Sequence, residues 1–335
     1  MHFLSVSARA VIRTARATTA FVLAVGLFAT AAHAAYPERP VRVVIGLQAG
    51  ASTDTLGRAL AQKLSERLGQ QFLIDNRPGA ATRIAMEAVS RAPADGYTLG
   101  IVNAVAVNFP LMFNDFEFSP GKDFAPITTL GRAPSFLAVP ATLSAKNVEE
   151  FLAYAKANDG KLTFGQGSNG SNPHLSALML VKSMGVDAVG IPYKGNAPTA
   201  LAVATGEVDF AMLDYQAVRP LVERGNVRLL AVTEPQRFVM TPDVPTSGER
   251  GLSRDLDGVT PWFMLVAPPG TPAEVIELLN RHVNEVLEDA TVRDAMSTVG
   301  IETDGSTSQE AAAYFLDQRE LSARVAKEMN LSFKN

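Results

Sequence analysis

Small and polar residues gather in four places, each directly after a predicted strand. They are residues 48–54, residues 165–172, residues 193–196 and the single residue Asn103. Where a helix starts, its first backbone N–H groups are unpaired and its dipole is positive, so such loops are suited to binding anions. Two of these places fall in each half of the chain. This pattern favours a ligand with an anionic group at each end, held between two domains.

One of these loops also matches a dinucleotide-binding pattern. Gly165, Gly167 and Gly170 have the G-x-G-x-x-G spacing between a predicted strand and a predicted helix, and Asp187 follows 17 residues later. The loop continues with polar residues rather than with a tightly packed helix, which argues against NAD and against a Rossmann oxidoreductase. Its N–H and hydroxyl groups remain suited to an anion.

Groups for catalysis are sparse. Ser168 lacks the glycine that a nucleophile elbow needs two positions earlier, because Gln166 stands there. The loop before Ser52 has no lysine and is therefore not a Walker A loop. The chain has no cysteine, and His174 and His282 are its only histidines beyond residue 34. Thiolate metal sites and clustered histidine metal sites are therefore excluded.

Three ionisable residues leave alternatives open. Lys194 is a nucleophile, a phosphate contact or a solvated lysine. Asp54 and Asp214 form a catalytic carboxylate pair only if the fold brings them together. The scarcity of catalytic groups favours a protein that binds its ligand, with an exported α/β enzyme as the alternative.

The first 34 residues differ from the rest of the chain. They combine Arg9, Arg13 and Arg16, the apolar run 17–32 and the sequence Ala32-His-Ala34, which is the pattern of a cleavable secretory signal. The apolar run is too short for a comfortable membrane span. We expect cleavage near Ala34 and export to the periplasm. Removal of three arginines and no acidic residue takes the net charge from −4 to about −7, which argues against nucleic acid as a partner.

The elements that position these loops alternate between strands and helices. Residues 41–45 form an apolar run typical of a strand covered on both faces, and residues 55–68 repeat leucine every fourth position, with Ser52 and Thr53 as candidate N-caps. Further strands are expected at 71–75, 97–102, 135–139, 162–164, 189–191, 208–212, 227–232 and 262–267, with helices between them and a final helix to about residue 329 that packs on the first sheet. Residues 108–126 show no clear period. The alternation predicts two largely parallel sheets, joined by two crossings, with a cleft between them.

A set of motifs resembles one family throughout the chain beyond the signal, and in the family's order. The family is that of the substrate-binding receptors of tripartite tricarboxylate transporters, the Bug family. The motifs are Tyr36-Pro-x-x-Pro-Val-Arg42, Gly50-x-Ser-Thr-Asp54, Asn76-Arg-Pro-Gly-Ala80, Ala94-Asp-Gly-Tyr-Thr98, Lys122-Asp-Phe-Ala-Pro126, Asn169-Gly-Ser-x-x-His-Leu175, Ile191-Pro-Tyr-Lys-Gly195, Gly206-x-Val-Asp209, Asp243-Val-Pro-Thr246 and Ala267-Pro-x-Gly-Thr-Pro272.

The resemblance implies a fold and a function. The fold is a two-domain α/β clamshell of the periplasmic binding-protein type (type II-like), with residues 35–131 and 253–335 in domain 1 and residues 132–252 in domain 2. The function is that of a monomeric periplasmic receptor for a small organic carboxylate, without catalysis, cofactor or metal. Its partners would be the permease subunits of a tripartite transporter, or a sensor kinase.

The resemblance also implies the residues that bind the ligand. The first wall would be Gln48, Gly50, Ala51, Ser52, Thr53 and Asp54, and the second wall would be Ser168, Asn169, Ser171, Tyr193, Lys194 and Gly195. Asp214 would close the floor. Because a carboxylate facing an anion is unfavourable, we expect Asp54 and Asp214 to bind waters, backbone N–H groups, or a ligand hydroxyl or amine.

Three departures from the family pattern fall at this expected ligand mouth. Gly46-Leu-Gln48 replaces the usual Pro-Phe-Pro, Thr82-Arg83 replaces the common Gly-Asn, and the usual Thr-His is absent between Asn103 and Asn108. Gln48 and Arg83 predict a more polar pocket with a stronger preference for carboxylates. The departures leave the identity of the acid open.

Overall fold

The computed structural model describes residues 36–113, 117–167, 171–252, 256 and 259–328. The predicted signal, residues 1–34, lies outside the described residues, as do the predicted ligand contacts Ser168 and Asn169. Residues 1–38 form a unit apart from Arg39–Asn335, and all that follows concerns the second unit. None of the helices in the described ranges is both long and apolar enough to cross a bilayer.

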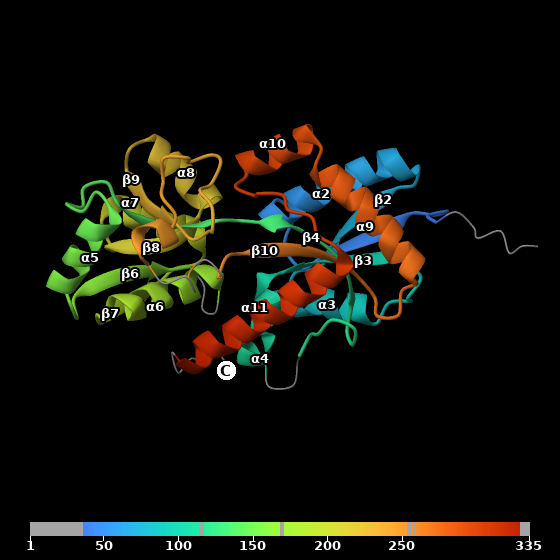
Figure 1. The fold of residues 1–335 in the computed structure, drawn as a ribbon, viewed down its shortest axis with the longest axis horizontal. Coiled ribbons are helices and arrows are strands. Elements are labelled where there is room, and N and C mark those ends of the chain that lie inside the picture. The colour runs from blue at the N-terminus through green and yellow to red at the C-terminus, as the bar shows by residue number, and fades with distance from the viewer. Residues whose placement is uncertain (1–35, 114–116, 168–170, 253–255, 257–258, 329–335) are drawn as a thin grey trace, which may run out of the picture. The chain divides into compact units, whose positions relative to one another are not determined.

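The first sheet has five strands in the order β2-β1-β3-β10-β4 (Figure 1). β1 pairs in parallel with both β2 and β3, whereas β10 runs antiparallel to β3 and β4. The strands are β1 Val41–Ile45, β2 Phe72–Asn76, β3 Thr98–Asn103, β4 Ala125–Arg132 and β10 Trp262–Ala267. The sequence predicted no strand at β4, because its central Ile-Thr-Thr-Leu lies between Pro126 and Gly131 and shows neither an apolar run nor strict alternation.

The second sheet repeats the same arrangement, in the order β7-β6-β8-β5-β9. β6 pairs in parallel with β7 and β8, and β5 runs antiparallel to β8 and β9. The strands are β5 Ser135–Pro140, β6 Leu162–Gln166, β7 Ala188–Pro192, β8 Phe210–Asp214 and β9 Val227–Val232. Each sheet therefore has four strands in one direction and one strand reversed, which confirms the prediction of two mostly parallel sheets.

Helices flank both sheets (Figure 1). They are α2 Ser52–Leu68, α3 Arg83–Ser90, α4 Phe109–Met112, α5 Val148–Ala157, α6 Asn172–Met184, α7 Asn196–Thr205, α8 Tyr215–Glu223, α9 Ala273–Leu287, α10 Ala290–Thr298 and α11 Ser308–Glu328, with short 3₁₀ turns η1 Ala80–Thr82, η2 Ala104–Asn108 and η3 Gly248–Arg250. The sequence did not predict α8, which contains Pro220.

The chain crosses between the sheets twice, as predicted. It passes from β4 into β5 through Ala133 and Pro134, and it returns from β9 to β10 through residues 233–261. The prediction that the last helix packs on the first sheet is incomplete. Phe315 of α11 is buried in the core of the first sheet, while Val325 of the same helix is buried in the core of the second. α11 therefore packs against both halves of the protein, because its apolar face contributes to two cores.

Candidate ligand-binding site

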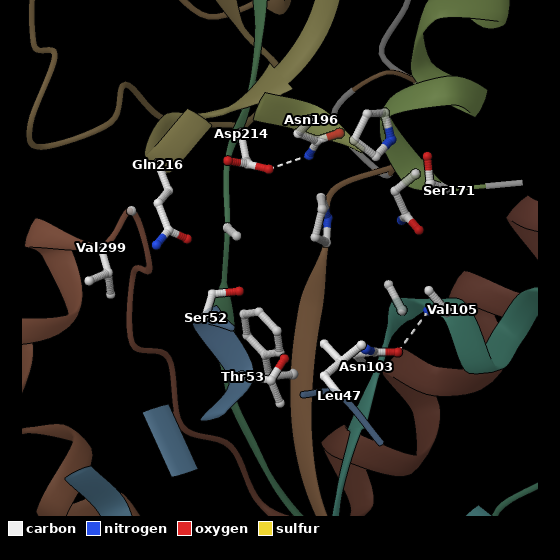
Figure 2. Close-up of a pocket in the computed structure, with 17 residues that line it drawn as sticks. Leu47, Ser52, Thr53, Asn103, Val105, Ser171, Asn196, Asp214, Gln216 and Val299 are labelled. Atoms are coloured by element: carbon white, nitrogen blue, oxygen red, sulfur yellow. Dashed lines mark hydrogen bonds between the residues drawn. The ribbon is translucent and has the colours of Figure 1, made fainter. Parts of the chain in front are cut away.

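A pocket of about 190 Å³ lies between the two sheets, at the ends of strands from both (Figure 2). The first sheet and its loops line it with Leu47, Ser52, Thr53, Asn103, Ala104 and Val105, the second with Ser171, Asn172, Pro173, Asn196, Asp214 and Gln216, and crossing or returning segments with Ala133, Pro261, Phe263, Val299 and Gly300. This volume is below the roughly 300–1,000 Å³ of pockets for drug-sized ligands, so it suits a small molecule.

The first wall of the pocket is the start of α2. The N-cap is Ala51, which makes no side-chain cap hydrogen bond, so the prediction of Ser52 or Thr53 as N-cap is wrong: both lie inside the first turn of the helix. Ala51 takes the extended backbone conformation of an N-cap, but it has no side-chain acceptor to offer the first-turn N–H groups. The positive end of a helix of 17 residues therefore borders the pocket without a cap.

Thr53 adds a second donor to this wall. Its side chain is 1% exposed, and its Oγ1 has no hydrogen-bond partner among the described residues. Leaving such a hydroxyl unpaired costs about 1–3 kcal/mol, so a partner supplied from the pocket would recover that loss. Asn103, the last residue of β3, completes the wall and accepts a hydrogen bond of 3.3 Å from the N–H of Val105.

The second wall is built from helix starts that carry side-chain caps. Ser171 is the N-cap of α6 and accepts a hydrogen bond from the N–H of His174, so the prediction of Asn172 as the cap is wrong. Asp214 is the N-cap of α8 and accepts a 2.9 Å hydrogen bond from the N–H of Ala217. The other carboxylate oxygen of Asp214 accepts a hydrogen bond from Nδ2 of Asn196 (Figure 2).

Ionisable groups are scarce around the pocket. Asp214 is the only ionisable side chain among the described lining residues, and no lysine, arginine or histidine lines it. His174 lies in the first turn of α6, directly after the lining residue Pro173, and burial lowers the pKa of its imidazole below the ordinary value and favours the neutral form. The positive potential on the described lining therefore comes from backbone dipoles and not from cations.

Asp54, a predicted ligand contact, does not line the pocket. Its buried carboxylate accepts hydrogen bonds of 2.9 Å from the N–H of Gly50, from Nε of Arg58 and from Nδ2 of Asn76. Burial opposes ionisation, but these three donors together lower the pKa of Asp54 below its ordinary value. Nδ2 of Asn76 also donates to the carbonyl of Leu47 over 3.0 Å. The carboxylate thus orders the loop that precedes α2.

Four other predicted ligand contacts, three at the first wall and Arg83 at the ligand mouth, are not part of the lining. Gln48, Gly50 and Ala51 belong to the loop before α2, and Leu47 faces the pocket in their place. Arg83 lies on α3, where its Nε donates to Glu87 over 2.6 Å and its guanidinium stacks 5.2 Å from the ring centre of Phe113. The geometry therefore gives no support to the expectation that Gln48 and Arg83 make the pocket more polar.

Three residues predicted at the second wall also lie outside the lining. The hydroxyl of Tyr193 donates to Glu207 over 2.8 Å, and Lys194 is exposed. Gly195 has φ of +101°, a conformation that suits glycine, and its N–H donates to the carbonyl of Gly167 over 2.7 Å. This turn starts α7 and presents Asn196 to the pocket.

The lining also includes residues that are not among the predicted ligand contacts. Phe263 and Pro261 come from the start of β10, Val299 and Gly300 come from the end of α10, and Gln216 follows Asp214 on α8. Gln216 alone has a local signal, because it lies two residues beyond Asp214, which the sequence analysis predicts as a ligand contact. The others reach the site only through the return of the chain to the first sheet.

The described fold has known counterparts. Residues 56–331 match the model of the tripartite tricarboxylate transporter family receptor, TctC. The chain belongs to this receptor family. BugT of Bordetella pertussis is 31% identical over 317 residues, which is 94% of this chain and 96% of BugT. The family is one of periplasmic solute-binding receptors of transport systems, and the Bug resemblance found in the motifs is confirmed.

Solved structures of this family have the same fold. The periplasmic binding protein BugD is 29% identical, with a TM-score of 0.71, over 90% of this chain and 100% of BugD. Rpa4515 of R. palustris, solved with adipate, is 31% identical with a TM-score of 0.75 over 90% of this chain and 100% of Rpa4515. MatC of Rhodopseudomonas palustris, solved with bound malate, is 29% identical with a TM-score of 0.67 over 88% of this chain and 100% of MatC.

Proposed function

We propose that this receptor captures a small organic carboxylate in the pocket between its two sheets and releases it unchanged. The observation that carries the proposal is the start of α2, where a helix end without a side-chain cap and the buried, unpartnered hydroxyl of Thr53 both face the pocket. Backbone N–H groups at a helix start and a hydroxyl are donors suited to a carboxylate. Relatives solved with adipate and malate support this class of ligand.

The ligand-binding residues we propose are those that line the pocket. Of the residues predicted from the sequence they include Ser52, Thr53, Asn103, Ser171 and Asp214. Asn196 and Gln216 join them from the second wall. Ser168 and Asn169 remain predicted contacts, adjacent in sequence to Ser171. We propose residues 35–131 and 253–335 as domain 1 and residues 132–252 as domain 2; the membership of the two sheets supports this division, and α11 contributes to both cores.

An exported enzyme is the second candidate, and the pocket argues against it. Asp214 is the only group on the described lining that could act as a general acid or base, and its two oxygens already accept hydrogen bonds from Asn196 and Ala217. No nucleophile paired with a base lines the described pocket. We therefore propose a binding role without catalysis.

Location and partners follow from the family. We propose export by the signal at residues 1–34, cleavage near Ala34, and delivery of the ligand to the permease subunits of a tripartite transporter. A sensor kinase would be the partner if no permease is encoded near this chain's gene. Mass spectrometry of the protein purified from periplasm tests the first part, since an N-terminus far from residue 35 would contradict it.

The function is tested by thermal shift against a panel of small carboxylates, with the corresponding amides as controls. Binding to the folded state raises the melting temperature according to ligand concentration and affinity. We expect one or more acids, and none of the amides, to stabilise the protein, and NMR to recover the acid unchanged. Consumption of the acid would instead show that the protein is an exported enzyme. If neither thermal shift nor calorimetry detects any carboxylate, the proposal is wrong.

A further inference from the structure

The two walls of the pocket offer opposite chemistry to a ligand. The first wall presents donors, namely the first turn of α2 and the hydroxyl of Thr53. The second wall presents the carboxylate of Asp214, the only charged group on the described lining. The starts of α6 and α8 on that wall already carry Ser171 and Asp214 as caps, which use part of their positive potential.

Asp214 keeps acceptor capacity after its internal hydrogen bonds are counted. A carboxylate has about four lone-pair sites, and Ala217 and Asn196 supply one donor each. The residue is half-buried and lines the pocket, so its remaining acceptor sites face a space that a ligand would fill (Figure 2). A ligand carboxylate placed against it would be repelled, because no lysine or arginine on the described lining neutralises the two charges.

We infer that the ligand is a hydroxy acid or an amino acid, bound with one carboxylate at the start of α2 and with its hydroxyl or ammonium group donating to Asp214. The inference rests on the proposed function and specifies its ligand class. A charge-assisted hydrogen bond to Asp214 satisfies the acceptor sites that face the pocket, whereas a plain dicarboxylate leaves them unpaired beside a second anion. The volume of about 190 Å³ is consistent with an acid of this small size.

The experiment is calorimetry on three sets of acids that differ in one group. Succinate, malate and aspartate share four carbons, and glutarate, 2-hydroxyglutarate and glutamate repeat the comparison with five, while propionate, lactate and alanine repeat it with three. We expect the best hydroxy or amino acid to bind at least tenfold more tightly than the plain acid of the same length. Comparison of the second and third member in each set distinguishes hydroxyl from ammonium.

The variant Asp214→Asn tests whether this preference comes from the proposed contact. Asparagine is also a good N-cap and can still accept from the N–H of Ala217, so the fold should survive the change. We expect the affinity for the favoured acid to fall about tenfold or more, while the affinity for the plain acid stays the same or rises. The control is Asp289→Asn, which alters an aspartate N-cap on α10 outside the pocket and should change neither affinity.

Each outcome decides the inference. Equal or tighter binding of the plain acids in every set would overturn it while leaving the receptor function intact. A preference that survives Asp214→Asn would overturn the role of Asp214. Loss of all binding in Asp214→Asn would also overturn it, because the plain acid should still bind. If no acid of any length binds the unchanged protein, the proposed function fails and the inference fails with it.

Discussion

The two walls of the pocket are built on similar sheets but differ in the hydrogen-bonding groups that they present. Both sheets have the same pattern of strand directions, and both place loops and helix starts at the pocket. On the first wall the start of α2 has no side-chain cap, and the hydroxyl of Thr53 is buried without a partner. On the second wall the starts of α6 and α8 are capped by Ser171 and Asp214. The first wall therefore offers hydrogen-bond donors to a ligand. On the second wall, side-chain caps already bind a donor at the starts of α6 and α8.

The contrast between Asp54 and Asp214 shows how such a difference arises. Asp54 is 2% exposed, and three donors around it, on Gly50, Arg58 and Asn76, occupy its carboxylate. Through these contacts it orders the loop before α2, and it does not cap the first-turn N–H groups of that helix. Asp214 stands at the N-cap of α8 itself and lines the pocket. A shift of a few residues relative to a helix start thus separates a structural aspartate from one that a ligand can reach.

The largest effect on stability is expected for Asp54→Asn. The new amide would direct N–H groups at one or more of its present donors, leaving a buried donor unpaired, and we expect the free energy of unfolding to fall by about 1–3 kcal/mol. Asp214→Asn keeps its cap on the N–H of Ala217, and the amide of the half-buried Asn196 can turn to accept from the new Nδ2, so this change should cost less than about 0.5 kcal/mol. Urea unfolding of both variants measures the difference. Equal losses would remove the distinction between the two aspartates.

Thr53→Val should separate affinity from stability. Valine has nearly the same shape and removes the unpartnered hydroxyl, so we expect about tenfold weaker binding of the acid, or about 1.4 kcal/mol, with stability unchanged or slightly higher. The control is Thr55→Val on the same helix, because the hydroxyl of Thr55 donates to the carbonyl of Ala51 and does not line the pocket. Weaker binding in the control alone would contradict the assignment of the first wall.

Only some of the residues that line the pocket, and few of their hydrogen-bond partners, could be predicted from the sequence. Ser52 and Thr53, which the family motif predicts as ligand contacts, do line the pocket, but the separate prediction that one of them is the N-cap is wrong, because nothing local shows that α2 starts after Ala51. The motif that placed Asp54 at the mouth could not reveal Arg58 and Asn76 as its partners, since Asn76 reaches it only through the pairing of β1 with β2.

Local sequence patterns also fail to predict contacts between segments that are far apart in the chain. The strands other than β4, and the two crossings between the sheets, were predictable from the alternation of apolar strand-like runs with helical segments, which depends on local residues. Phe263, Val299 and Gly300 reach the pocket from a segment that returns after the second sheet, so no local pattern marks them. Arg83 was predicted at the mouth from its place in a motif, and its pairing with Glu87 one turn further along α3 turns it away.

His174, in the first turn of α6, predicts that folding stability depends on pH. Burial lowers the pKa of His174, so the unfolded chain binds more protons than the folded chain below the unfolded pKa of about 6.5. This contribution to stability is complete above that pH and is lost as the pH falls. We expect urea unfolding to show lower stability at pH 5.5 than at pH 7.5, with a slope of at most about 1.4 kcal/mol per pH unit from this residue. His174→Gln should reduce the slope; an unchanged slope would contradict the assignment.

The smallest effect is expected for Lys194→Ala. Lys194 is exposed and does not line the pocket, so we expect less than a twofold change in affinity for the acid, measured by calorimetry. The comparison sharpens the claim that the positive potential of the site comes from helix starts. A tenfold loss would mean that this lysine contacts the ligand and that the site depends on a cation after all.

The central claim is that a carboxylate binds at the start of α2, and a crystal structure with the tightest acid found in the panel tests it most directly. The account predicts a carboxylate oxygen within hydrogen-bond distance of the Thr53 hydroxyl and of the first-turn N–H groups, with the hydroxyl or ammonium group of the ligand near Asp214. A ligand whose carboxylates all lie on the second wall, with the Thr53 hydroxyl still unpaired, would contradict it.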